Sequence, residues 1–219
     1  MQKSMEIISK NDEKKFHLLY IWAIIEAVLI YSHIFILSVL DEWNIAKLLR
    51  MAIVFLPIVL LIINLIIVLI SYKKLDRTVF LGCSVLIKYI LIPFYIIGAA
   101  IICICLLFMF SPVIIMAFVA PVVTVTFTVY GWCVIVAMAP FSIAYLLKAK
   151  KDGVLPKIIT KIAIVTQFLF CVDVVTIMIL AILREHKWVK LTIFLLSLLS
   201  LCAMGIGCFI AINIIKAFV

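Results

Sequence analysis

The strongest constraint on this chain is a series of apolar runs that are each long enough to cross a lipid bilayer. These runs occupy residues 17–39, 51–71, 79–110, 112–147, 158–183 and 189–216. A membrane-spanning helix needs about 20 apolar residues. Charged residues make up only 13% of the chain, against about 25% in soluble domains. The sequence therefore predicts an all-α polytopic integral membrane protein with about six transmembrane helices.

The distribution of Lys and Arg between these runs predicts the orientation. Cytoplasmic segments of membrane proteins are enriched in both residues. The N-terminal tail and the regions on its predicted side carry thirteen Lys and Arg, and the opposite side carries five. We therefore expect 1–16 to be a cytoplasmic tail and 17–219 to form a single transmembrane helical domain. Both termini are expected on the cytoplasmic side of the plasma membrane.

The fourth run, 112–147, is longer than a bilayer requires. As one straight helix it would be about 54 Å long, whereas the hydrocarbon core is about 30 Å thick. Pro121, Gly131 and Pro140 lie within it, and proline and glycine are common sites of helix kinks. We expect either one kinked helix or two separate elements here.

Five polar residues lie inside the apolar runs, namely Glu26, His33, Asn64, Lys88 and Asp173. Counting from the predicted cytoplasmic helix ends at 1.5 Å per residue predicts two layers. Glu26 would pair with Lys88 in the cytoplasmic layer, with Asn64 beside them, and His33 would pair with Asp173 in the outer layer. Ionisable groups at such depth are costly and often functional. They indicate a substrate or proton pathway, or else pairs that only fix helix packing.

The sequence predicts no cofactor, no metal and no nucleic-acid partner. Seven cysteines all lie in the apolar runs, where cysteine behaves as a small hydrophobic residue. Zinc-protease, phosphate-loop and dinucleotide-binding motifs are absent from the sequence. The net charge of +9 comes from the flanks of the runs, where basic residues set orientation and attract anionic lipid. We therefore assign no catalytic residue.

These features favour a small transporter or channel-like protein that is coupled to protons through its intramembrane ionisable residues. One alternative is a non-catalytic membrane subunit, a permease or scaffold, that docks a cytoplasmic partner such as an ATPase through the basic stretch 148–157. Another is a membrane enzyme that acts on lipid. The lipid bilayer is the expected partner in every case. Ala203, Gly207 and Ala211 recur every four residues, so the last run packs closely within one subunit or forms a homo-oligomer seam.

Overall fold

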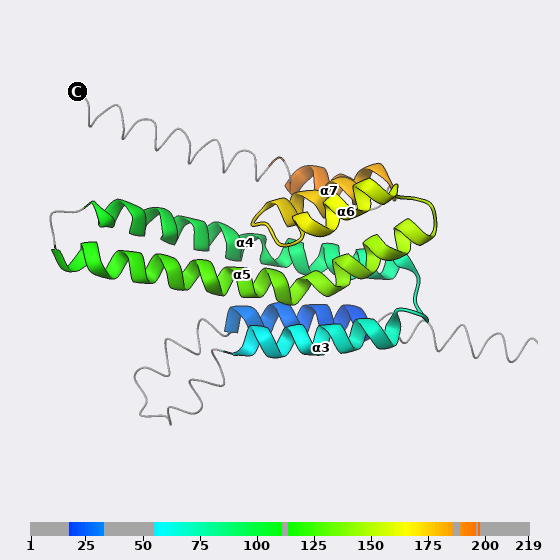
Figure 1. Cartoon of the computed structure of the whole chain (residues 1–219), viewed down its shortest axis with the longest axis horizontal. Helices are drawn as coiled ribbons and strands as arrows, with labels where there is room; N and C mark the ends of the chain where they lie inside the picture. The colour runs from blue at the N-terminus through cyan, green and yellow to red at the C-terminus, as the bar shows by residue number, and fades with distance from the viewer. Residues whose placement is uncertain (1–17, 33–54, 111–113, 186–188, 196, 198–219) are drawn as a thin grey trace, which may run out of the picture. The chain divides into compact units, whose positions relative to one another are not determined.

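The computed structural model describes residues 18–32, 55–110, 114–185, 189–195 and 197. Its helices are Leu18–Ser32, α3 (Leu56–Ser71), α4 (Arg77–Met109), α5 (Ile114–Lys151), α6 (Lys157–Thr166) and α7 (Val172–Leu183) (Figure 1). All regular structure in this part of the chain is helical, which confirms the predicted all-α class there. Among the described helices, α4 and α5 are long and apolar enough to cross a membrane.

The chain divides into two compact units, Met1–Ile177 and Met178–Val219. The first unit contains the N-terminal helix, α3 to α6 and the start of α7. The second contains the end of α7 and helical residues 189–195. Both termini and the predicted small-residue seam at 203–211 lie outside the described residues, so these expectations stay predictions.

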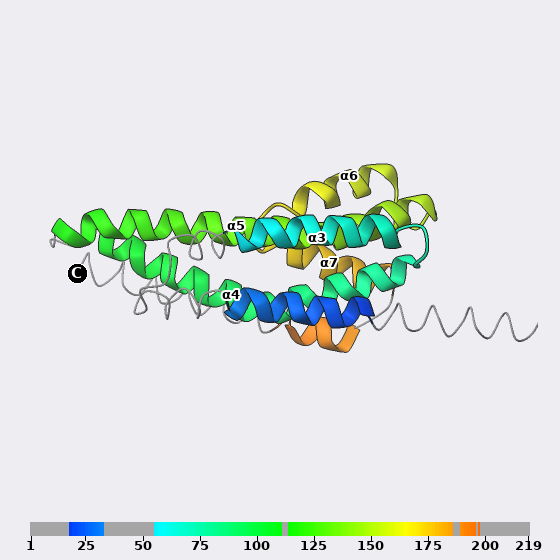
Figure 2. The same ribbon diagram turned by 90° about the horizontal axis from the view of Figure 1, so that it is seen from below.

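The core of the first unit is built on α4 and α5, which lie side by side in Figures 1 and 2. α3 packs against α5, and its first turn contains Pro57, whose fixed φ suits the start of a helix. Phe80 and Leu91 of α4 and Phe141 of α5 are fully buried. Apolar packing between long helices therefore positions every polar group described below.

Gly82 of α4 allows the N-terminal helix to approach closely. A Cβ atom at this position would overlap Tyr20 Oη, because it would lie far inside the contact distance of two atoms that are not bonded. Any larger residue at position 82 must displace the Tyr20 ring.

α5 is one continuous helix of 38 residues, so the single-helix alternative for the fourth run is confirmed. Pro121 and Pro140 lie inside it. Each proline removes one backbone hydrogen bond, and the turns on either side keep the helix continuous. Figure 1 shows that α5 bends in its second half, as proline within a helix predicts.

The prediction of a single helix over 158–183 is wrong, because the chain is interrupted between α6 and α7. α6 ends at Thr166 and α7 begins at Val172. In Figures 1 and 2 the start of α7 runs in the opposite direction to α6. The 10 residues of α6 and the 12 residues of α7 correspond to about 15 and 18 Å. Each helix is therefore too short to cross a hydrocarbon core of about 30 Å.

Local side-chain chemistry explains why α6 stops. Gln167 Nε2 donates to the carbonyl oxygen of Ala163 at 3.0 Å, and Thr166 Oγ1 donates to the same oxygen at 2.8 Å. Such bonds compete with the helical ladder and favour a helix end. Cys171 then has a φ of 62°, a left-handed conformation that is uncommon for residues other than glycine. These two features together turn the chain back.

Candidate functional site

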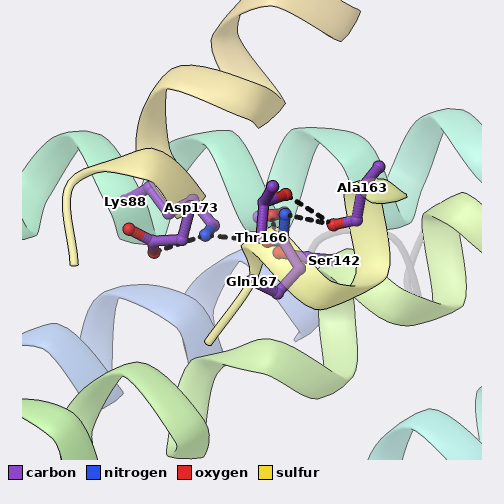
Figure 3. A network of polar contacts seen from close by, with 7 residues as sticks. Lys88, Ser142, Ala163, Thr166, Gln167 and Asp173 are labelled. Carbon is purple, nitrogen blue, oxygen red and sulfur yellow. Dashed lines mark hydrogen bonds and ion pairs between the residues drawn. The ribbon is translucent and has the colours of Figure 1, made fainter. Parts of the chain in front are cut away.

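A buried ion pair joins the middle of α4 to the start of α7 (Figure 3). Lys88 Nζ donates to Asp173 Oδ2 at 2.7 Å, and the two side chains are only 3% and 2% exposed. Asp173 lies in the first turn of α7, where the positive end of the helix dipole favours a carboxylate. Burying one of these charges without the other would be costly. The pair therefore couples the turn between α6 and α7 to α4.

Gln167 completes the surroundings of the Lys88 ammonium. Its Oε1 accepts a hydrogen bond from Lys88 Nζ at 3.0 Å. Because its Nε2 donates to the Ala163 carbonyl, the amide is held with its oxygen toward the lysine (Figure 3). Gln167, which directly follows the last residue of α6, thus also binds the buried Lys88 ammonium.

The Asp173 carboxylate is only half satisfied. Its Oδ1 is buried and has no hydrogen-bond partner among the described residues, whereas Oδ2 accepts from Lys88. Most buried polar atoms in proteins have a partner, and an exception calls for an explanation. A carboxylate oxygen without a partner still has lone pairs that can accept a hydrogen bond.

Two hydroxyl groups tie α4 to α5 one turn away from Lys88. The Oγ atoms of Ser84 and Ser142 are 2.5 Å apart, and both residues are buried. Ser84 precedes Lys88 by four residues, so the two share a face of α4. This bond holds the lysine-bearing face of α4 against α5.

The turn between α6 and α7 is also held by α5. Trp132 Nε1 donates to the carbonyl oxygen of Phe168 at 3.3 Å. A Cβ at Gly131 would lie 3.0 Å from the Phe170 ring, so glycine is what lets that ring pack against α5. The middle of α5 thus holds the turn that leads to Asp173.

A second polar cluster surrounds Glu26 on the N-terminal helix. Its Oε1 accepts from Asn64 Nδ2 of α3. The same amide nitrogen donates to the Ala137 carbonyl of α5 at 2.8 Å, and Trp22 Nε1 donates to Asn64 Oδ1 at 2.8 Å. Glu26 is fully buried, and within the described part of the chain its Oε2 has no hydrogen-bond partner. Asn64 therefore links three helices and leaves one carboxyl oxygen free.

The structure corrects the predicted pairs. The Glu26–Lys88 pair is wrong, because Lys88 bonds to Asp173 and Gln167 while Glu26 bonds to Asn64. The prediction that Asn64 lies beside Glu26 is confirmed. His33 lies outside the described residues, so nothing tests its contribution. The prediction of a deeper Asp173 assumed one continuous helix from 158, and the interruption after Thr166 shortens that path.

Gln167 and Trp22 belong to these clusters although neither was predicted from the sequence. Gln167 is a polar residue inside an apolar run, and that alone could have singled it out. Trp22 resembles an ordinary residue of the membrane interface in sequence, and only its bond to Asn64 reveals its part. Among the described residues, no group of three His, Cys, Asp or Glu side chains is placed to hold a metal ion.

Comparison with known proteins gives a family and no activity. No curated protein and no solved structure matches this chain. One family model, described as a family of unknown function (DUF6652), matches residues 12–188. The matched region includes both polar clusters and the turn between α6 and α7. The chain belongs to the DUF6652 family.

Proposed function

We propose that this protein is a multi-pass membrane transport protein in which the Lys88–Asp173 pair is the proton-responsive element. The observation that carries the proposal is the pair itself, a buried lysine and carboxylate at a helix interruption with one carboxylate oxygen unpartnered. Transport proteins place substrate and ion sites at interrupted helices near the middle of the membrane. Ionisable groups buried at such depth mark ion and proton pathways.

Membrane placement is supported by the outward faces of the helices. Ile62, Leu65 and Leu69 of α3 and Val122 and Val125 of α5 are all about half or more exposed. In water each would cost free energy, because apolar surface is favourably removed from water. In a bilayer these faces would contact lipid chains at no such cost. The basic flanks and these faces support a membrane location, for which we propose the plasma membrane.

A proton cycle at the pair would give the protein two states. Protonation of Asp173 would remove its negative charge and free the Lys88 ammonium from it, which weakens the contact between α4 and the turn before α7. Loss of the proton would restore the ion pair. Because α6 and α7 are each shorter than a membrane span, movement of this turn is the step that would open the transport pathway.

The interruption also changes the expected topology. A hairpin of two short helices enters and leaves the membrane on one side, so the sequence following α7 returns to the side where α6 begins. This moves Arg184, Lys187 and Lys190 to the basic side, leaving Lys47 and Arg50 as the basic residues of the connections on the opposite side. The charge asymmetry that orients membrane proteins thereby becomes stronger. The termini would then lie on opposite sides if the last apolar run crosses the membrane.

Epitope insertion tests this topology. Short tags inserted after Gly153 and after Glu185 are expected to react with antibody from the same side of sealed vesicles. A tag inserted after Ile45, in the connection between the first two apolar runs, is the control and should react from the opposite side. Gly153 is exposed and has open space around it, so the first insertion should be tolerated. Reaction of the Gly153 and Glu185 tags from opposite sides would contradict the hairpin.

Proton flux tests the transport proposal. The purified protein would be reconstituted in liposomes that contain a pH-sensitive dye, with a potassium diffusion potential that is negative inside and a pooled extract of water-soluble metabolites outside. We expect internal acidification at least about tenfold faster than in liposomes that contain heat-inactivated protein. Equal rates would contradict autonomous proton-coupled transport and favour the subunit alternative, in which a separate ATPase should co-purify.

A further inference from the structure

A cationic cavity of about 420 Å³ lies where α5 ends and α6 begins, beside the last turn of α3. Three lysines line it, Lys150 and Lys151 at the end of α5 and Lys157 at the start of α6. Tyr72, directly after α3, forms part of the wall. The remaining wall is apolar and comes from Leu147, Leu155 and Pro156. The cavity therefore combines positive charge with an apolar floor.

The charged side chains next to the cavity bond to groups outside it, so they do not neutralise the three cavity lysines. Asp152, the acid within this connection, accepts from Arg77 at 2.8 Å. Lys148 already has two partners. Its Nζ donates to the Leu75 carbonyl at 2.6 Å and lies 5.0 Å from the Tyr72 ring centre. Within the described part of the chain, the cavity lysines themselves have no ion pair. An anion from outside the chain is thus the natural partner of the cavity.

The surface next to the cavity identifies the source of that anion. Ile158 and Ile162 of α6 are 73% and 60% exposed, and Val165 is 63% exposed. These positions are spaced by four and three residues, so they form one face of α6. An apolar stripe thus starts directly after Lys157. In a bilayer, lysines at the start of such a stripe would lie at the height of the lipid headgroups, and the stripe would face the acyl chains.

We propose that this cavity binds the headgroup phosphate of an anionic phospholipid, with the acyl chains along the exposed face of α6. Lysine-rich pockets between helices on the cytoplasmic side of membrane proteins bind such headgroups. The ammonium groups supply charge-assisted hydrogen bonds to phosphate oxygens. Because α6 also leads to Gln167 and the ion pair, a lipid bound here would hold the start of the hairpin. This inference rests on the membrane placement proposed above and needs no transport activity.

Native mass spectrometry of the full chain, with matched double variants, tests the site. The protein would be released from nanodiscs of equimolar phosphatidylglycerol and phosphatidylcholine, and the retained lipid would be counted. We expect the wild type to retain phosphatidylglycerol over phosphatidylcholine by at least about tenfold. In Lys150→Gln/Lys151→Gln this preference should fall at least about tenfold, because each lysine near an anionic surface contributes about fivefold.

The control is Lys73→Gln/Lys74→Gln, which removes the same charge from exposed lysines of the connection between α3 and α4. It should keep the preference within about twofold. An equal loss in the two double variants, or no preference in the wild type, would overturn the site. Displacement of the lipid by millimolar inorganic phosphate or glycerol phosphate would assign the cavity to a free phosphate and likewise overturn it. A transport failure with lipid retention intact would refute only the proposed function.

Discussion

Replacing Asp173 by leucine is expected to lower the free energy of unfolding by about 3–5 kcal/mol. The reason is that Lys88 would lose its charge partner in a site where its side chain is only 3% exposed, and only its hydrogen bond to Gln167 among those described above would remain. Lys88→Met should cost a similar amount, because it strands the buried carboxylate. The double variant Lys88→Met/Asp173→Leu should recover most of the loss, since apolar pairs often replace buried ion pairs at little cost. Titration of SDS into the protein in mild detergent micelles measures these differences.

The exposed ion pair between Arg77 and Asp152 provides the control. Its side chains are 29% and 43% exposed, and pairs of this kind contribute less than about 1 kcal/mol. Asp152→Asn should therefore change the unfolding transition little. If Asp173→Leu proved as mild as Asp152→Asn, the two charges could not be paired in a buried site.

Replacing Asn64 by leucine is expected to cost at least about 3 kcal/mol. The amide bonds to Glu26 Oε1, to the Ala137 carbonyl and to Trp22 Nε1, and leucine can replace none of these bonds. Each buried polar group left without a partner costs about 1–3 kcal/mol. Since these partners come from the N-terminal helix and α5, the loss should loosen the packing of three helices. The same detergent titration measures the effect, with circular dichroism reporting the helix content.

Thr126→Val is the matched control for Asn64→Leu, because it also removes a polar side chain from a helix. Thr126 is exposed, and its Oγ1 bonds only to the Val122 carbonyl of its own helix at 2.8 Å. Its replacement should change stability by less than about 0.5 kcal/mol. Equal effects of the two substitutions would show that Asn64 does not link the helices.

The helical architecture could be predicted because it depends on the amount of apolar sequence. Long runs with few charges specify helices whose outer surface is apolar, and α4 and α5 agree with this in length and composition. Proline content was a poorer guide. Pro121 and Pro140 bend or pass through α5 without ending it, whereas α6 ends without any proline at its C-terminus.

The candidate residues were predictable, and their pairing was only partly so. Glu26, Asn64, Lys88 and Asp173 stand out because each is polar within an apolar run, and all four are buried. Counting residues placed Asn64 beside Glu26 correctly. The same count wrongly placed Lys88 beside Glu26 although α4 is uninterrupted, because depth along a helix does not determine which side chains face one another. The position of Asp173 depends on the turn after Thr166, which is set by side-chain bonds and by one left-handed residue. Hydrophobic periodicity carries no signal for such a turn.

We propose that the Lys88–Asp173 pair responds to protons during transport and does more than hold helices together. The measurement that tests it most directly is the initial rate of proton uptake by liposomes containing Lys88→Met/Asp173→Leu, compared with the wild type at equal protein content. Because the double variant should retain the stability of the fold, its rate isolates the chemical role of the pair. We predict a rate below about one tenth of the wild-type rate. A folded double variant that takes up protons as fast as the wild type would contradict the account and leave the pair a purely structural contact.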